Sequence, residues 1–135
     1  MRHGKKKKRI LIYNKNYFDM TKTYLSPDEI ISITADYFRI APELWLNCSR
    51  KREYIKCKHI AMYCFRQFTD LSFRDIGMIC GGKDHATVMH AVKKINGFID
   101  SYEADRKEME LILKIMKDKA EDNFTKYITY NTENV

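Results

Sequence analysis

The strongest constraint on the fold of this chain is a pair of helix starts separated by two glycines. Ser72 is followed three residues later by an acidic residue, which is a helix N-capping signature, and Asp84 stands directly before the next apolar repeat. Gly81 and Gly82 lie between these starts, where glycine adopts positive φ angles at no steric cost. We therefore expect a short helix that ends near Cys80, a tight turn, and a longer helix that begins after Asp84.

The longer helix is expected to have one apolar side and one polar side. Val88, Val92, Ile95 and Ile99 recur at the helical period and predict its buried side. The first turn instead carries polar residues, beginning with His85. A short helix, a glycine turn and a second helix with a polar first turn form a helix-turn-helix pattern.

The rest of the sequence also favours helices. A capping box formed by Ser26 and Glu29, with Pro27 at the first helical position, predicts a helix over residues 26–39. Further helices are predicted over residues 41–46, 53–68 and 101–119. Only 5 Gly and 2 Pro leave too few turns for a multi-stranded β fold, so we predict an all-α fold.

The length of 135 residues suits one domain, which we place between two tails. Residues 1–25 are expected to form a basic N-terminal tail, residues 26–120 the folded domain, and residues 121–135 a C-terminal tail. The formal net charge is +7, and residues 1–9 contain six basic residues and no acidic one. A basic tail suits a polyanion such as nucleic acid; the alternative is a solubilising, disordered start.

Composition and cysteine spacing indicate the cellular setting. The longest uncharged run is far shorter than about 18 residues, so we predict no membrane span, and no apolar signal-peptide segment follows the basic start. The four cysteines are separated by gaps of 9, 7 and 16 residues and include no C-x-x-C pair. This spacing favours buried thiols in a reducing cytosol, so we expect a cytoplasmic protein with no metal and no cofactor.

No arrangement of residues indicates catalysis. Gly77, Gly82 and Lys83 match three fixed positions of a phosphate-binding loop, but Asp84 stands where a hydroxyl would have to bind magnesium. Such a loop also follows a strand, and a helix is expected here. The clustered acidic residues at the start of the segment 101–119 fit a solvated helix face. We therefore predict that the protein is not an enzyme.

The segment 53–68 is expected to form a helix with two different sides. Ala61, Cys64, Phe65 and Phe68 are apolar at helical spacing. The other side carries basic residues and one tyrosine at gaps of three and four, namely Arg52, Lys56, His59, Tyr63 and Arg66. Such a stripe is either a solvated face or a ligand-binding face, and the residues alone leave both open.

One segment resembles a known family. Residues 70–95 read DLSFRDIGMICGGKDHATVMHAVKKI. Within it, GGKDHATVMHA resembles the GGRDHTTVLHA signature of the C-terminal DNA-binding domain of DnaA, the bacterial replication initiator. The resemblance extends over residues 28 to about 118 and keeps the glycine and polar positions in register, which makes it specific.

The resemblance implies an all-α bundle of about six helices, similar to Trp-repressor-type domains, that binds a short duplex DNA site. The helix that begins at Asp84 would enter the major groove, and the basic loop before the segment 53–68 would reach the adjacent minor groove. Other basic side chains would contact phosphates. The DNA-binding residues that the resemblance implies are Arg50, Arg52, Lys56, Lys58, Ser72, Phe73, Arg74, Lys83, Asp84, His85, Ala86, Thr87, Lys93 and Lys94.

The chemistry of the first-turn residues agrees with this role. An aspartate accepts a hydrogen bond from a cytosine amino group, a histidine donates to guanine or thymine, and a methyl group packs on the thymine methyl. Asp84 also has the alternative role of helix cap, and one side chain can serve both.

The sequence departs from the family's pattern at several positions. Ala86 replaces a threonine, and Lys56 and Lys83 stand where arginine is usual, which exchanges a rigid planar fork for a mobile charge. Cys57 and Arg74 replace prolines. A shifted or relaxed site preference is therefore expected.

The family's initiator also carries an ATPase module ahead of this domain, whereas about 27 residues precede it here, so we expect no ATP-driven origin opening.

Two functions of different classes follow. The first is sequence-selective binding of double-stranded DNA at a DnaA-box-like site, in replication initiation, its regulation or transcription control. The second is a helical adaptor that keeps the fold without binding DNA, with Trp45, Tyr37 and the aromatic residues of the tails contacting a protein partner. The Asp84-His85 pair combined with the basic stripe favours the first.

Overall fold

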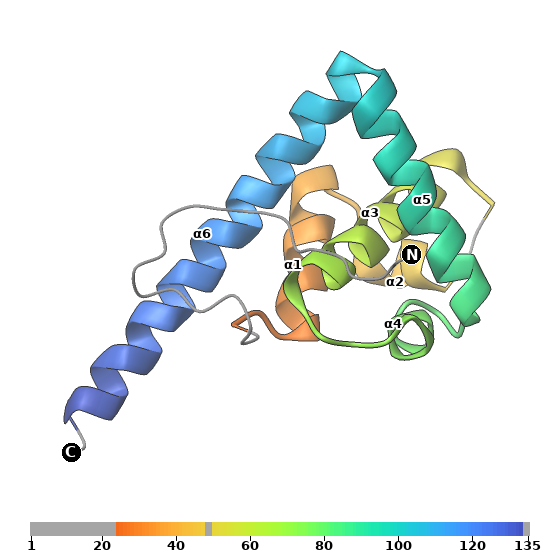
Figure 1. Ribbon diagram of the computed structural model, residues 1–135. Helices are drawn as coiled ribbons and strands as arrows, with labels where there is room; N and C mark the ends of the chain where they lie inside the picture. Colours follow the sequence, from red (N-terminus) through yellow and green to blue (C-terminus); the bar gives the residue numbers. More distant parts are fainter. Residues whose placement is uncertain (1–23, 48–49, 134–135) are drawn as a thin grey trace, which may run out of the picture.

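The computed structural model describes residues 24–47 and 50–133, and in this part of the chain every regular element is a helix (Figure 1). The helices are α1 (Pro27–Phe38), α2 (Pro42–Leu46), α3 (Arg52–Phe68), α4 (Phe73–Ile79), α5 (His85–Ser101) and α6 (Glu103–Glu133). The prediction of an all-α fold with about six helices is confirmed. The lysine run near the start of the chain and Cys48 lie outside the described residues.

Local capping determines where α1 begins and ends. Ser26 Oγ accepts a hydrogen bond from the Glu29 amide at 3.1 Å, and Glu29 Oε1 accepts one from the Ser26 amide at 2.9 Å. This is the predicted capping box, with Pro27 in the first turn of the helix. The helix ends at Arg39, whose φ of 58° is left-handed.

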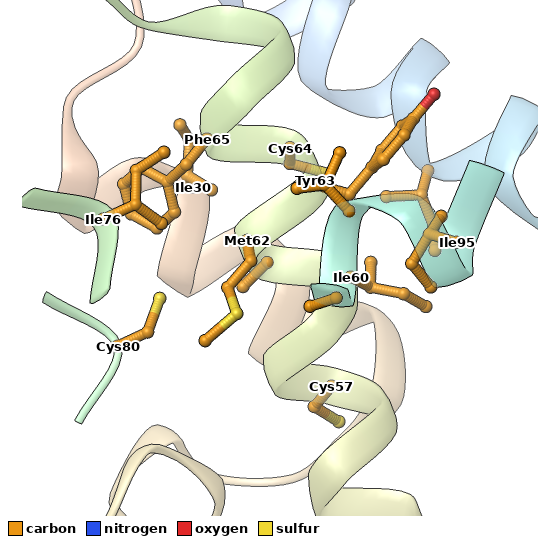
Figure 2. Packing of buried hydrophobic residues seen from close by; sticks show 14 of the residues in the cluster. Ile30, Cys57, Ile60, Met62, Tyr63, Cys64, Phe65, Ile76, Cys80 and Ile95 are labelled. Atoms are coloured by element: carbon orange, nitrogen blue, oxygen red, sulfur yellow. The ribbon is translucent and has the colours of Figure 1, made fainter. Parts of the chain in front are cut away.

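Helix α3 forms the centre of the hydrophobic core. It packs against α1, α2, α4 and α5, so its apolar side chains are enclosed by four other helices. In Figure 2, Phe65 points toward Ile30 of α1 and Ile76 of α4, while Ile60 points toward Ile95 of α5. Each of these five side chains is at most 5% exposed. Burying a side chain of this size stabilises the fold by about 1.5–3 kcal/mol, so α3 holds the helix-turn-helix to the rest of the domain.

The short helix α2 contributes an aromatic anchor to the same core. Trp45 is fully buried, and its indole Nε1 donates a hydrogen bond to the Ile40 carbonyl at 3.0 Å. Tyr37 packs partly buried against the core. Of the two body aromatic residues that an adaptor would need on its surface, Trp45 is therefore in the interior and Tyr37 packs against it.

The packed structure begins before the capping box. Leu25 is 1% exposed and belongs to the core, and the Tyr24 ring meets the Phe124 ring edge-on with centroids 5.0 Å apart. The boundary expected between tail and domain at residues 25 and 26 therefore lies too late, because Leu25 is part of the core and Tyr24 packs on α6. A capping box marks where a helix starts, but side chains before it can still pack on distant elements.

Helix α6 is longer than the sequence predicted. It was expected to end near Lys119 and to be followed by a tail, but it continues to Glu133. Two features support the extension. Lys126 and Asp122 form an i,i+4 ion pair at 3.4 Å, and Asn123 Nδ2 donates to the Tyr24 carbonyl at 2.6 Å. The apolar period fades here, where the contacts of α6 within the described residues are with Tyr24 and with Glu29 of α1.

Helices α5 and α6 meet at a sharp angle and then diverge, with the end of α6 extending beyond the other helices (Figure 1). Tyr102 separates the two helices, and its amide donates to the Phe98 carbonyl at 2.9 Å. This corner keeps the start of α5 and the far end of α6 on different sides of the domain.

Within the described residues, no helix is long and apolar enough to cross a membrane.

Candidate nucleic-acid interface

The junction between α4 and α5 is packed around two glycines that have no room for a side chain, Gly77 within α4 and Gly81 in the turn that follows it. A Cβ on Gly77 would collide with the Lys83 carbonyl, and a Cβ on Gly81 would collide with the Leu46 carbonyl of α2. Gly81 also has a φ of 95°. The Lys83 amide donates to the Gly77 carbonyl at 2.8 Å, which closes the turn. The start of α5 is therefore fixed against both α4 and α2.

Both predicted caps of the helix-turn-helix are present. Ser72 Oγ accepts a hydrogen bond from the Asp75 amide at 3.0 Å at the start of α4. Asp84 Oδ1 accepts from the Thr87 amide at 2.9 Å and from the Thr87 hydroxyl at 2.8 Å at the start of α5. These bonds hold the pKa of the Asp84 carboxyl below its ordinary value, with the amide bond as the largest cause. Asp84 is therefore a carboxylate at neutral pH.

The first turn of α5 is open to solvent. Asp84, His85 and Thr87 are exposed, while Lys83 and Ala86 are partly exposed. Both cap bonds use Oδ1 of Asp84, so the cap does not occupy Oδ2. The side chains predicted to read bases thus lie together on one rigid, accessible helix start, and the two roles proposed for Asp84 are geometrically compatible.

The residues predicted at the start of α4 serve first as structure. Ser72 is the N-cap, and the Phe73 ring lies 4.8 Å from the guanidinium carbon of Arg66 on α3. Arg74 is exposed. Arg66, a member of the basic stripe of α3, therefore lies against the start of α4.

The basic residues near the start of α3 do not all face solvent. Arg50 and Arg52 are exposed. Lys56 Nζ, in contrast, lies 2.9 Å from Glu108 Oε1 of α6, and Lys58 is only 7% exposed. The charge of Lys58 acts on the buried Cys80 thiol. Burial raises the pKa of this thiol, and the positive charge of Lys58 offsets part of that rise, which leaves the pKa at about 12. Three of these four cations are therefore exposed, one of them paired with Glu108, and the fourth, Lys58, is buried.

A hollow of about 360 Å³ separates α3, α5 and the start of α6. Its basic lining comes from Arg52, Lys56, His59 and Lys94, and its acidic lining comes from α6. Burial lowers the pKa of His59, and the charges of Lys94 and Lys58 lower it further, so its imidazole is neutral at pH 7. Three members of the predicted basic stripe therefore face a partly enclosed hollow. Lys93, the other predicted phosphate contact on α5, is exposed.

The described cysteines are buried and unpaired. Cys57, Cys64 and Cys80 are free thiols in the core, and burial raises the pKa of Cys57 to about 11. Thiols in this state are poor nucleophiles, which agrees with the predicted packing role. Among the described residues, no group of three or more histidine, cysteine or acidic side chains is placed to hold a metal ion.

Two helices joined by a closed glycine turn, the second offering its capped first turn to solvent, define a helix-turn-helix protein. The profile of the family described as bacterial DnaA protein helix-turn-helix matches residues 27–95, just over half of the chain. The chain belongs to this family. The resemblance that the GGKDHATVMHA segment indicated is thereby confirmed.

Similar proteins include several named chromosomal replication initiator protein DnaA. The one from Cutibacterium acnes is 46% identical over 78 residues, which cover 58% of this chain and 16% of that protein. The one from Bacteroides thetaiotaomicron is 38% identical over 90 residues, covering 64% and 19%, and the one from Thermus thermophilus is 39% identical over 75 residues, covering 56% and 17%. The chain thus spans less than a fifth of the length of these relatives.

Proposed function

We propose that this protein binds double-stranded DNA in a sequence-selective way, with the first turn of α5 in the major groove. The observation that carries this proposal is the exposed, capped start of α5, held in place by the close contacts of Gly77 and Gly81. A reading element must be rigid before it meets DNA, because disorder in its side chains would lower discrimination between bases. Membership of the DnaA helix-turn-helix family supports the same function.

Within this proposal, three residues read bases. The free Oδ2 of Asp84 accepts a hydrogen bond from a cytosine amino group, and the exposed His85 donates to a guanine or thymine acceptor. Ala86 offers a methyl group to a thymine methyl. Thr87 supports Asp84 through its hydroxyl, so its contact with DNA is to the backbone.

Basic side chains on either side of the first turn anchor the DNA backbone in this proposal. Lys83 precedes α5, Arg74 lies at the start of α4, and Lys93 and Lys94 follow along α5. The minor groove is contacted by the basic residues before and at the start of α3, namely Arg50, Arg52 and, once it is released from Glu108, Lys56. A narrow A·T-rich groove attracts such cations. Lys58 is buried and acts through the position of α3.

We further propose that the DNA site resembles a DnaA box and that the host process is replication initiation, its regulation or transcription control. The names of the relatives support a replication role. We do not propose that the glycines around Lys83 form a nucleotide-binding loop. Gly77 lies within α4, and its carbonyl accepts the Lys83 amide, so this amide is already used and does not cradle a phosphate.

Selection of bound duplexes from a random pool, using the full chain, tests this function. We expect enrichment of a DnaA-box-like word and a log affinity that falls linearly with log salt, because several lysine and arginine contacts release counterions. Binding to all sequences alike would contradict base reading by α5. Absence of duplex binding would instead favour the adaptor, although burial of Trp45 and packing of Tyr37 against the core argue against it.

A further inference from the structure

The ammonium group of Lys56 contacts two other helices, although the side chain is about half open to solvent. Its Nζ lies 2.9 Å from Glu108 Oε1 of α6 and 5.6 Å from the centre of the Phe38 ring of α1. Its side chain is 47% exposed, whereas that of Glu108 is 26% exposed. The ammonium group is therefore directed toward α1 and α6, and the carboxylate that binds it is partly shielded from water.

This ion pair differs from the others on α6. Three of them join residues one turn apart within α6, and both partners in each are more than half exposed: Lys107–Glu103, Lys114–Asp118 and Lys126–Asp122. A fourth, Lys119–Glu29, also joins α6 to another helix, but its charged atoms are 3.9 Å apart. Pairs of that kind contribute little and are screened by salt. Lys56–Glu108 instead joins α3 to α6 at a shorter distance, and salt screens it less because one partner is partly buried.

Given the DNA-binding function proposed above, on which this inference rests, we propose that Glu108 limits the affinity of the protein for DNA by competing for Lys56. Lys56 cannot hold a carboxylate of its own chain and a DNA phosphate or groove edge at full strength at the same time. Binding must therefore exchange one anion for the other. The exchange is easiest where the groove potential is most negative, so Glu108 also biases Lys56 toward narrow A·T-rich segments.

The surroundings of the pair require a control for long-range charge. Arg52, His59 and Lys94 line the same hollow, together with the acidic Asp105. Removing any acid from α6 makes the whole chain one unit more positive and tightens DNA binding slightly. Glu110 provides the matched control because it lies two residues further along α6 and is exposed, and in the described part it forms no ion pair.

The experiment compares Glu108→Gln with Glu110→Gln in the full chain, by titration of a fluorescent duplex that carries the selected site. We expect Glu108→Gln to bind about two- to fivefold more tightly than Glu110→Gln, which is the range that weak ion pairs span. The slope of log affinity against log salt should also become steeper by up to about 0.9, because Lys56 then neutralises a phosphate without giving up another anion. Equal affinities for the two variants would overturn the inference.

A double-mutant cycle separates competition from a general field effect. In a Lys56→Gln background, Glu108→Gln should change affinity by no more than Glu110→Gln does in that background, since the competed cation is gone. Tightening that persists without Lys56 would overturn the inference. Lys56→Met, which keeps most of the apolar stem over Phe38, replaces Lys56→Gln if circular dichroism shows that the latter is unfolded. Loss of duplex binding in every folded variant, including the wild type, would overturn the proposed function itself.

Discussion

The start of α5 and the start of α3 both carry polar and basic residues that the sequence assigned to DNA, but the fold treats them differently. At the start of α5, the Asp84 carboxylate accepts its hydrogen bonds within the described residues from Thr87 of its own turn, and its neighbours are exposed or partly exposed. At the start of α3, Lys56 is bonded to α6 and Lys58 is buried. The comparison teaches that charge counted from a sequence is not charge available to a ligand.

The difference has a physical origin in the range of the contacts. A helix cap satisfies the first amides of its own helix, so it leaves the outward side of the turn free. Lysine side chains are long enough to reach neighbouring helices, and an acid from a distant segment then decides where the ammonium group lies. The first region is expected to discriminate between sequences, and the second to set overall affinity.

The largest effect is expected where the start of α5 is fixed to α4. Gly77→Ala places a Cβ against the Lys83 carbonyl and 3.3 Å from Val88 Cγ2. It should therefore lower the free energy of unfolding by about 3 kcal/mol, measured by urea denaturation, and displace the first turn of α5, which is proposed to read bases. Gly97→Ala is the control, because a Cβ there meets nothing within 4 Å, and it should stabilise α5 by about 0.5–1 kcal/mol. Equal stabilities would show that the turn is not tightly fixed.

A smaller effect should distinguish base reading from backbone anchoring. His85→Ala is expected to cost about 1–3 kcal/mol on the selected site and much less on random duplex, because His85 contributes through base edges. Lys94→Ala should instead weaken both duplexes alike and reduce the salt slope by about 0.9. Competition titrations with both duplexes measure this.

The same titrations test Asp84 apart from folding. Asp84→Asn keeps the helix cap, since asparagine caps as well as aspartate, but it replaces an acceptor-only side chain. It should lose discrimination at one base pair. If His85→Ala and Asp84→Asn reduced specific and non-specific affinity by the same factor, α5 would lie on the DNA backbone and the two regions would not differ in role.

The smallest effect concerns acid stability of the cap. The pKa of Asp84 is lowered in the folded protein, so its stabilising contribution is present above the ordinary aspartate pKa of about 3.9 and is lost as pH falls through the lowered value. Asparagine does not titrate, so the Asp84→Asn variant serves as the reference. The Tm of the wild type minus that of the variant should decrease as the pH is lowered from about 5 to about 2. Thermal melts followed by circular dichroism check this, and a constant difference would mean that the cap bonds do not favour the carboxylate.

The helix starts were predictable because their determinants are local. Ser26, Ser72 and Asp84 each accept the amide three residues later, as their sequence spacing indicated. The glycine turn was predictable for the same reason, since Gly81 and Gly82 both have positive φ angles. Together these features predicted the all-α fold and the position of the first turn of α5.

The features that local sequence patterns do not predict depend on contacts between distant segments. Tyr24 packs on Phe124 and extends the domain at both ends, which no local period shows. The Lys56–Glu108 pair joins residues that are far apart in the chain, and the burial of Lys58 depends on how α3 meets its neighbours. Side-chain length permits each of these arrangements without requiring it, so only the packed structure selects among them.

The hydrogen bond from Asn123 to the Tyr24 carbonyl joins residues 99 positions apart and closes the described chain into a loop of helices. Its consequence is a boundary in local stability along a single continuous helix. Before Asn123, α6 contributes Met109, Ile112 and Met116 to the core, so its amides exchange hydrogen with solvent only when much of the domain opens. Beyond Asn123 the side chains of residues 125–129 are exposed, with Tyr127 still meeting the Tyr24 ring at a centroid distance of 6.2 Å. We therefore expect the last turns of α6 to exchange their amide hydrogens sooner, while the helix-turn-helix stays folded.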